Sequence, residues 1–271
     1  MKGRVLIIAG SDSGGGAGIQ ADIKTVTMLN AFAATAITAV TAQNTQGVHG
    51  VLPVPPDFIR QQIEVVLDDI GADAVKTGML HDAEVIETVA SVLTQRASGV
   101  PLVLDPVMVA KGGAPLIEGG AIDTLKRLLA PLAAVLTPNL PEAEILAGRT
   151  IDSLDAMREV AGQLLALGCR AVLLKGGHLP GEQVHDILAT ASALREWHSP
   201  RIDSRHTHGT GCTLASAIAA GLAQGLAMED AVERARDYVQ RAIASAPGIG
   251  GGHGPLDHAH PLRAQRSWSV E

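Results

Sequence analysis

Aromatic side chains and positive charge are both scarce in this chain of 271 residues. Aromatic residues make up 2% of the sequence, and the formal net charge is −7. A nucleic-acid binder needs a basic surface and usually aromatic side chains for base stacking, so we expect no nucleic-acid partner. Hydrophobic residues still reach 46%, which is enough to build a sizeable core. We therefore expect a single domain over residues 1–271.

Cysteine and long apolar runs are also scarce. Cys169 and Cys212 are the only two cysteines, which favours free thiols in a reducing compartment over a disulfide framework. The uncharged stretch 212–228 is rich in alanine and glycine and is interrupted by polar side chains, which is more typical of a buried helix than of a membrane span. The apolar run near the N-terminus is too short for the core of a signal peptide. We expect a cytoplasmic protein with no membrane segment.

Short β-rich apolar runs alternate with longer segments of helical period along most of the chain. The predicted strands are 4–10, 35–43, 74–78, 100–106, 133–139 and 169–177. The later predicted helices are 119–130, 153–167, 211–225 and 229–246. This alternation predicts a mostly parallel sheet covered by helices. The segment 183–203 breaks the pattern and predicts an antiparallel hairpin at one end of the sheet. Residues from about 261 to 271 are expected to form a loosely ordered tail.

Phosphate-binding signatures of the common kinds are missing. The chain has no Walker A sequence and no protein-kinase signature. The glycine-rich turn at 9–22 is a weak match to a dinucleotide fingerprint, because the second strand ends in Gln43 and not in an acidic residue. The carboxamide of Gln43 carries a donor and an acceptor side by side, which suits a heterocycle with an amino group next to a ring nitrogen. A loop residue that satisfies its own backbone is the alternative.

Several polar side chains follow predicted strands, at the edge where parallel sheets bind ligands. Asp105, Asn139 and Glu142 supply the kind of oxygen atoms that Mg²⁺ takes as ligands. The alternative for Asn139 is helix capping, since Pro141 follows it, and a solvated first-turn carboxylate is the commoner explanation for Glu142 alone. Lys175 precedes two glycines, where its charge would meet a polyphosphate, or it is an ordinary surface lysine.

The stretch HGTGC joins a glycine turn to a predicted helix. Its Gly209, Thr210 and Gly211 would bring unpaired N–H groups and the positive end of the helix dipole to one point. Such a point suits an anion or the charge that develops on a transferring phosphoryl group. The same field is expected to lower the pKa of Cys212, which favours a base or a nucleophile over a small core residue. Cys169 most simply packs in the core.

Taken together, an ordered set of motifs resembles the hydroxymethylpyrimidine/phosphomethylpyrimidine kinases, members of the ribokinase-like superfamily, from about residue 5 to 260. The motifs are AGSDSGGGAGIQADIKT, AQNT, TGML, LDPVMVAKGG, TPNLPEAEIL, LLKGGH and HGTGCTLASAIA. The resemblance implies a three-layer αβα sandwich without a lid domain, and a homodimer. It implies two phosphorylations in thiamine biosynthesis that use ATP and Mg²⁺. The first acts on the hydroxymethyl group of 4-amino-5-hydroxymethyl-2-methylpyrimidine and the second on the monophosphate.

The resemblance also implies a role for each matching position. The residues that it places around the pyrimidine are Gly10, Asp22, Gln43 and Met79. Those that it places on Mg²⁺ are Asp105 and Glu142. Those that it places on ATP are Asn139, Lys175 and Thr210. The catalytic residues that it implies are Lys175, the anion hole Gly209, Thr210 and Gly211, and the base Cys212, where ribokinases usually carry an aspartate.

Two departures from the family pattern and three alternatives accompany this prediction. Gly14 replaces a common serine, and AKGG at 110–113 replaces the usual lysine-serine-glycine. The nearest alternative is a pyridoxine or pyridoxal kinase on the same fold, although such kinases more typically carry aspartate in place of Cys212. A non-catalytic pyrimidine-binding sensor would not need the phosphate-binding residues. A cysteine-dependent hydrolase lacks a clear Cys/His/Asn arrangement.

Overall fold

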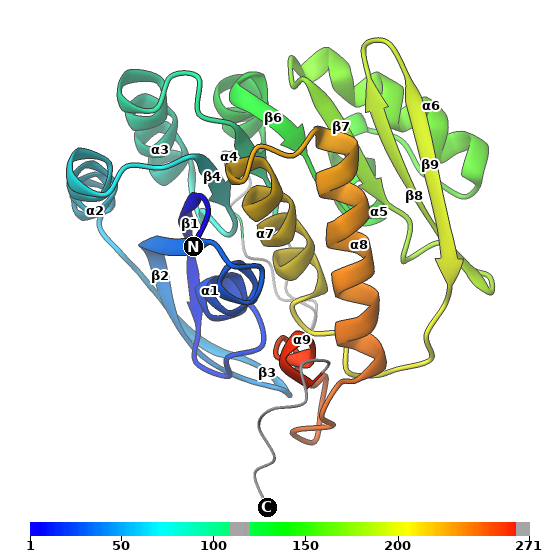
Figure 1. The fold of residues 1–271 in the computed structure, drawn as a ribbon. Coiled ribbons are helices and arrows are strands. Elements are labelled where there is room, and N and C mark those ends of the chain that lie inside the picture. The colour runs from blue at the N-terminus through cyan, green and yellow to red at the C-terminus, as the bar shows by residue number, and fades with distance from the viewer. Residues whose placement is uncertain (109–116, 118–119, 264–271) are drawn as a thin grey trace, which may run out of the picture.

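A mixed sheet of nine strands forms the middle layer of the computed structural model, which describes residues 1–108, 117 and 120–263 (Figure 1). The strands are β1 (Arg4–Asp12), β2 (Phe32–Asn44), β3 (Gly47–Pro53), β4 (Ala74–Thr77), β5 (Leu102–Leu104), β6 (Ala133–Leu136), β7 (Ala171–Lys175), β8 (Gln183–Thr190) and β9 (Leu194–Pro200). Their order across the sheet is β3-β2-β1-β4-β5-β6-β7-β8-β9.

The central strands, from β2 through β1 and β4 to β7, run parallel, so their carboxyl ends meet at one edge. Strands β8 and β9 continue the sheet antiparallel to β7, which confirms the predicted hairpin at one end. At the opposite end β3 pairs antiparallel with β2 and was not predicted. Its sequence, GVHGVLP, contains two glycines and a proline and lies mostly exposed, so it carries little of the usual strand pattern.

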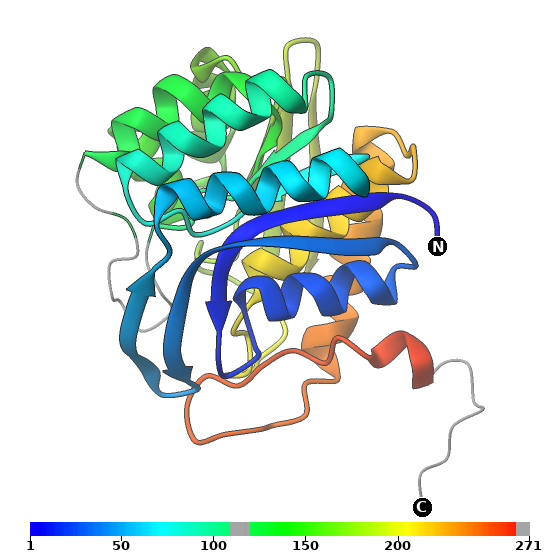
Figure 2. The ribbon, with the colours of Figure 1, turned by 90° about the vertical axis from the view of Figure 1, so that its left-hand side faces the viewer.

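Helices cover both faces of the sheet, and Figure 2 shows β1 and β2 between α2 on one side and α1 on the other. The helices are α1 (Gly18–Met28), α2 (Pro56–Asp69), α3 (Ala83–Arg96), α4 (Ala121–Thr124), α5 (Leu140–Ala147), α6 (Leu154–Leu164), α7 (Thr210–Ala223), α8 (Met228–Ala244) and α9 (His260–Arg263). The predicted helix 119–130 is a composite, because α4 continues as a π-helical turn at 125–129 and a 3₁₀ turn at 130–132.

Strand β1 shows why the core has two halves. Its side chains alternate between the faces, so Leu6 and Ile8 join one apolar cluster while Val5 and Ile7 join the other, and all four are fully buried. Helices α2, α3, α5 and α6 pack on the first half, and α1, α7 and α8 on the second. A strand buried on both faces is a continuous apolar run in the sequence, which is why β1 was predictable.

The layers account for every helix and strand of the described residues, and these residues include no separate lid domain. The predicted three-layer αβα sandwich is confirmed. Residues 261–263 of the predicted tail belong to α9, whereas 264–271 and the AKGG segment at 110–113 lie outside the described residues. Among the described helices, none combines the length and the apolar character that crossing a bilayer requires.

Candidate active site

A cavity of about 640 Å³ opens at the carboxyl ends of the parallel strands, where the polar motifs were expected to meet. Its volume is typical of a small-molecule site. The structure brings most of the predicted site residues into its wall. These are Gly10, Gln43, Met79, Asp105, Asn139, Glu142, Lys175, Gly209, Thr210, Gly211 and Cys212.

Asp22 is the exception among the predicted site residues. It lies on the face of α1 that packs against the sheet, has no exposed surface and does not line the cavity. Its two carboxylate oxygens accept hydrogen bonds from Lys76 Nζ at 3.0 and 2.9 Å, and one also accepts from the Ser216 hydroxyl at 2.7 Å. The substrate-binding role of Asp22 stays a prediction, and the structure connects Asp22 to the cavity wall through Lys76.

Lys76 was not among the predicted site residues, although it borders the cavity from β4. Its side chain is fully buried. Burial alone would lower the pKa of Lys76, but the Asp22 carboxylate, together with weaker effects of Cys212 and Asp105, outweighs it and raises that pKa above its ordinary value. A lysine inside the short buried strand AVKT was the sequence signal for a charged group held in the core.

Lys175 and Asp105 form an ion pair in the cavity wall. Lys175 Nζ donates to Asp105 Oδ1 at 3.1 Å, and the Thr137 hydroxyl donates to the same oxygen at 3.2 Å. Burial works against the charge of Lys175, yet Asp105 and Glu142 outweigh it and raise the pKa of Lys175. Lys175 is thus a charged group in the wall of the cavity and not an ordinary surface lysine.

Asn139 and Glu142 close a capping box at the start of α5. Asn139 Oδ1 accepts from the Glu142 N–H at 2.9 Å, and Glu142 Oε2 accepts from the Asn139 N–H at 2.8 Å. The predicted alternative of helix capping is therefore present, and it holds both side chains at the cavity wall. Glu142 is buried, so it is not the solvated carboxylate of the other alternative. Burial raises the pKa of Glu142 to about 7, while Lys175 opposes that shift and Asp105 adds to it.

Helix α7 begins at the cavity with a glycine turn. Gly209 has φ +84°, and a Cβ atom there would lie 1.9 Å from the Gly16 carbonyl oxygen, so only glycine fits. A Cβ at Gly211 would lie 3.3 Å from Lys175 Nζ, which shows how closely the turn approaches that ammonium. The Thr210 hydroxyl donates to the Thr207 carbonyl at 2.7 Å and steadies the turn. The N–H groups of this first turn have no partner within the helix, which suits an anion.

The two cysteines differ in position but share a raised pKa. Cys169 lies in the core, with its Sγ 3.6 Å from the Leu164 carbonyl oxygen, as predicted. Cys212 lines the cavity, and burial raises the pKa of its thiol to about 11. Lys76 opposes this shift, but the charges of Asp22 and Asp105 add to it. The expected lowering of the pKa of Cys212 is therefore wrong for the protein without ligands, in which the thiol is protonated at neutral pH.

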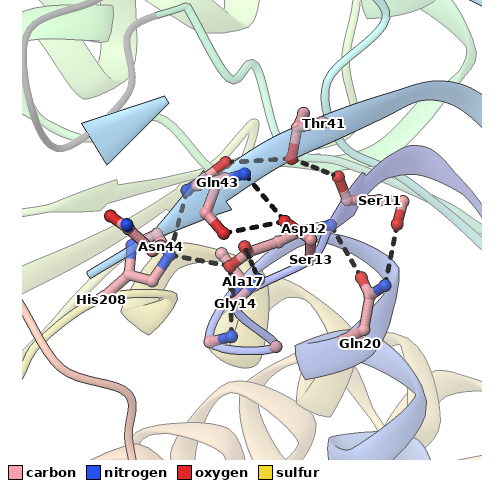
Figure 3. Close-up of polar contacts among 12 residues, drawn as sticks. Ser11, Asp12, Ser13, Gly14, Ala17, Gln20, Thr41, Gln43, Asn44 and His208 are labelled. Carbon is pink, nitrogen blue, oxygen red and sulfur yellow. Dashed lines mark hydrogen bonds and ion pairs between the residues drawn. The ribbon is translucent and has the colours of Figure 1, made fainter. Parts of the chain in front are cut away.

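Gln43 also lines the cavity and belongs to a network that includes Asp12 and His208 (Figure 3). Gln43 Nε2 lies 3.3 Å from His208 Nε2, which lies 2.9 Å from Asp12 Oδ2. Asp12 also holds the glycine-rich turn, since its carboxylate accepts the N–H groups of Gly14, Gly16 and Ala17. Asp12 and His208 were not among the predicted site residues. The signal for Asp12 was an aspartate at the head of a glycine run, a common way to hold a turn.

The departure at Gly14 has a structural reason. A Cβ atom there would lie 3.1 Å from Asp12 Oδ1 and 3.3 Å from the Asn44 Cα and the Gln43 carbonyl oxygen. A larger residue would press on the turn that Asp12 holds. Glycine therefore suits the close approach between the end of β2 and this turn.

The carboxylates of Asp105 and Glu142 fit a Mg²⁺ ion, which proteins bind through one or two carboxylates together with phosphates and waters. The described residues contain no group of three or more His, Cys, Asp or Glu side chains that could hold a metal on their own. Burial is the main cause of the raised pKa of Glu142, and the charge of Lys175 opposes it more strongly than Asp105 adds to it.

Comparison with known proteins finds a matching family model and similar kinases of several organisms. A family model described as phosphomethylpyrimidine kinase matches residues 12–257. A hydroxymethylpyrimidine/phosphomethylpyrimidine kinase of Bacillus subtilis is 50% identical over 256 residues, which cover 94% of each chain. A thiamine biosynthesis bifunctional protein of Geobacter sulfurreducens is 54% identical over 257 residues, or 95% of this chain, which spans only 52% of that longer protein.

Solved structures from both branches of these kinases are similar to the chain. A phosphomethylpyrimidine kinase of Clostridium difficile superposes with a TM-score of 0.80 at 42% identity, and the match covers 89% of this chain and all of that one. An ADP complex of Bacillus subtilis pyridoxal kinase gives a TM-score of 0.89 at 38% identity, with 97% and 99% of the two chains covered. A Staphylococcus aureus pyridoxal kinase in complex with AMP-PCP and pyridoxal gives 0.88 at 34% identity, with 97% and 96% covered.

Proposed function

Because the chain belongs to the phosphomethylpyrimidine kinase family, we propose that it phosphorylates 4-amino-5-hydroxymethyl-2-methylpyrimidine and then the monophosphate, with ATP as the phosphoryl donor, in thiamine biosynthesis. One observation carries the proposal. A single cavity has a carboxamide, Gln43, in one part of its wall, and Cys212, Lys175 and Asp105 beside the N-terminus of α7 in another. The same cavity therefore contains a group that suits a heterocycle and groups that suit phosphoryl transfer.

Gln43, Gly10 and Met79 form the recognition part of the cavity in this proposal. The carboxamide accepts a hydrogen bond from the amino group of the pyrimidine and donates one to the adjacent ring nitrogen. A Cβ at Gly10 would lie 3.4 Å from Met79 Sδ, so the glycine leaves room for a flat ring beside that thioether. Sulfur against an aromatic ring is a favourable contact.

Phosphoryl transfer takes place at the N-terminus of α7. The hydroxymethyl oxygen attacks the γ-phosphorus of ATP, the bond from that phosphorus to the bridging oxygen breaks, and ADP leaves. The N–H groups of Gly209, Thr210 and Gly211 stabilise the charge on the transferring group, and Lys175 and Asn139 bind the phosphates. Such reactions depend mainly on positioning and on charge stabilisation, so these groups contribute the larger share of the rate.

Cys212 accepts the proton of the hydroxymethyl group. Its own thiol must first ionise, and the pKa of about 11 makes this the demanding step at neutral pH. Lys76 is the buried cation that favours the thiolate. A base with a small ionised fraction suffices because the transition state of phosphoryl transfer requires little help from a base.

Mg²⁺, held by Asp105 and Glu142, would neutralise charge on the phosphate oxygens of ATP when bound. The two side chains are kept in place by groups already described. Thr137 and Lys175 hold Asp105, and the capping box holds Glu142. Both carboxylates are thus oriented by the protein before a ligand arrives.

We also propose a homodimer that acts in the cytoplasm. Val40 and Leu52 pair directly across β2 and β3 and are exposed apolar side chains at one end of the sheet, and β3 is its edge strand. An exposed apolar pair on an edge favours burial against a second chain. The two free thiols support a reducing compartment. Sedimentation of the protein and of Leu52→Glu tests the dimer, and a monomer in both would contradict it.

A pyridoxine or pyridoxal kinase is the second candidate. The similarity of the fold to the Bacillus subtilis and Staphylococcus aureus pyridoxal kinases favours it. Pyridoxine also offers a hydroxymethyl group on a heterocycle. It lacks the amino group next to a ring nitrogen that suits the Gln43 carboxamide.

The decisive experiment measures ADP release with Mg²⁺ present and with three substrates in parallel: the aminopyrimidine alcohol, its monophosphate and pyridoxine. We expect turnover with both pyrimidines and a far lower kcat/KM with pyridoxine. Turnover with pyridoxine alone would assign the chain to the second candidate. No turnover with any of the three would favour a non-catalytic pyrimidine-binding sensor.

A further inference from the structure

The Gln43 carboxamide lies between two polar neighbours that restrict how it can be oriented (Figure 3). On one side, its Oε1 is 3.4 Å from the Thr41 hydroxyl oxygen. On the other, its Nε2 is 3.3 Å from His208 Nε2. The two ends of a carboxamide are nearly equal in shape, so the hydrogen-bonding polarity of the neighbours decides which end faces which side.

His208 offers a donor to Gln43. His208 Nε2 is 2.9 Å from Asp12 Oδ2, and a carboxylate can only accept. Burial alone would raise the pKa of Asp12, but the hydrogen bonds from His208 and from the turn outweigh it and lower that pKa, so Asp12 is ionised at neutral pH. His208 Nε2 must therefore carry a proton, so the carboxamide 3.3 Å from this nitrogen faces an N–H group and not a lone pair.

Thr41 offers an acceptor to Gln43. Its hydroxyl donates its single proton to the Ser11 carbonyl oxygen at 2.8 Å, and a carbonyl can only accept. The side of the Thr41 oxygen that faces Gln43 then presents lone pairs. If the carboxamide turns its oxygen to Thr41, two acceptors face each other. In the same orientation, its amino group and the His208 N–H are two donors that face each other. Rotation by half a turn about the last side-chain bond places a donor opposite an acceptor on both sides, with the His208 N–H shared between Asp12 and Gln43.

We propose that His208, held by Asp12, is a positioning residue that turns the Gln43 carboxamide oxygen toward itself and the amino group toward Thr41. The inference rests on the proposed function for the identity of the ligand. It goes beyond a contact between Gln43 and the pyrimidine, because it states which end of the carboxamide faces His208 and which faces Thr41. Thr41 completes the arrangement from the opposite side.

The direction decides which way round the substrate binds. In the aminopyrimidine alcohol, the amino carbon lies between the ring nitrogen and the carbon that bears the hydroxymethyl group. When the amide oxygen is on the His208 side, the amino group binds there, and the hydroxymethyl group lies on that side too. His208 directly precedes the turn of Gly209 to Cys212. The reverse orientation would place the hydroxymethyl group on the Thr41 side.

The test compares His208→Leu, which removes the donor, with His208→Gln, whose amide nitrogen takes the place of Nε2. His198→Leu on the exposed edge strand β9 is the matched control. The substrates are the aminopyrimidine alcohol and the analogue without the amino group. We expect His208→Leu to lower kcat/KM for the alcohol about 10-fold, the size of one net hydrogen bond, while the KM for ATP stays unchanged. His208→Gln should recover most of the loss, and the analogue without the amino group should be little affected.

Nitrogen-15 NMR of the protein without ligands gives a readout that does not depend on activity. The His208 ring should show a protonated Nε2, assigned by comparison with His208→Gln. Protonation of Nδ1 alone would overturn the proposal. Equal losses with both substrates, or equal losses in the leucine and glutamine variants, would also overturn it, because a purely structural role would affect both substrates alike. If the wild-type protein phosphorylates neither pyrimidine, the proposed function fails, and the NMR result still decides the orientation of Gln43.

Discussion

Two lysine–aspartate pairs lie close enough to Cys212 to affect the pKa of its thiol, and they differ in how far their side chains are exposed to the cavity. Lys76 Nζ lies 2.9 Å from Asp22, and both side chains are fully buried. Lys175 Nζ lies 3.1 Å from Asp105, with 13% of the lysine side chain exposed at the cavity wall. Charges of both pairs shift the pKa of Cys212, so the thiol is sensitive to each.

The two pairs have the same chemistry, so we attribute their different expected roles to the difference in burial. The Lys76–Asp22 pair joins β4 to α1 and is closed further by Ser216 of α7, so its removal would affect three elements of the fold. The Lys175–Asp105 pair joins the ends of two strands, where incoming phosphates can compete for the lysine. We expect stability to depend on the first pair and turnover to depend on the second.

The largest expected effect is on stability, in Asp22→Asn. The amide is close in shape to the carboxylate but leaves the Lys76 charge uncompensated inside the core, and breaking a buried pair in this way costs about 3–5 kcal/mol. The free energy of unfolding should fall by this amount in urea titrations. Asp73→Asn, which breaks the exposed pair with Arg4, is the control and should change far less. Equal losses in the two variants would show that burial does not distinguish the pairs.

Lys175→Met should affect turnover more than stability. The variant removes a charge that faces the transferring phosphoryl group, and loss of one such group lowers kcat about 10²- to 10³-fold. Its melting temperature should fall less than that of Asp22→Asn, because Lys175 is partly exposed at the cavity and Thr137 still donates to Asp105. Lys2→Met, at an exposed lysine, is the control. A stability loss as large as that of Asp22→Asn, with kcat retained, would contradict the expectation that turnover depends on the Lys175–Asp105 pair.

Cys212→Ala tests the residue that both pairs influence. We expect kcat to fall about 10²-fold, at the lower end for a general base, with the KM of the pyrimidine nearly unchanged. Cys169→Ala is the matched control, since this thiol lies in the core and should leave kcat intact. Undiminished turnover in Cys212→Ala would remove the base role.

The smallest expected effect is a pH dependence of the wild-type enzyme. The pKa of the Cys212 thiol is raised to about 11, so the ionised fraction grows as the pH rises toward that value. The kcat/KM for the pyrimidine alcohol should therefore increase between about pH 7 and 9, and the increase should disappear in Cys212→Ala. A flat profile in the wild-type enzyme would mean that the thiolate of the free enzyme does not limit the reaction.

The fold was predictable where the residues of a strand are buried on both faces. The strands β1, β5, β6 and β7 are short apolar runs with turns on either side, and the comparison proteins confirm the predicted kinase fold and family. Strand β3 was missed because its pairing with β2 is visible only in the folded protein. Helix α5 was not predicted as an element, although its capping residues Asn139 and Glu142 had been singled out.

The candidate site was predictable as a set of positions but not as a network. Parallel strands bring their carboxyl ends together, so residues that follow strands, such as Asp105 and Lys175, were expected to meet, and they do. The partners Asp22 and Lys76 are 54 positions apart, and Asp12 and His208 are 196 apart. No local pattern connects residues at such separations.

The sequence by itself determined which polar groups follow which strands, where a turn is rich in glycine, and which family the ordered motifs resemble. The tertiary structure decided the state of those groups. The direction of the pKa shift of Cys212 depends on how far burial outweighs a neighbouring lysine. The orientation of Gln43 depends on two acceptors, Asp12 and the Ser11 carbonyl, that act through His208 and Thr41. Both depend on distances between atoms, and these exist only once the chain has folded.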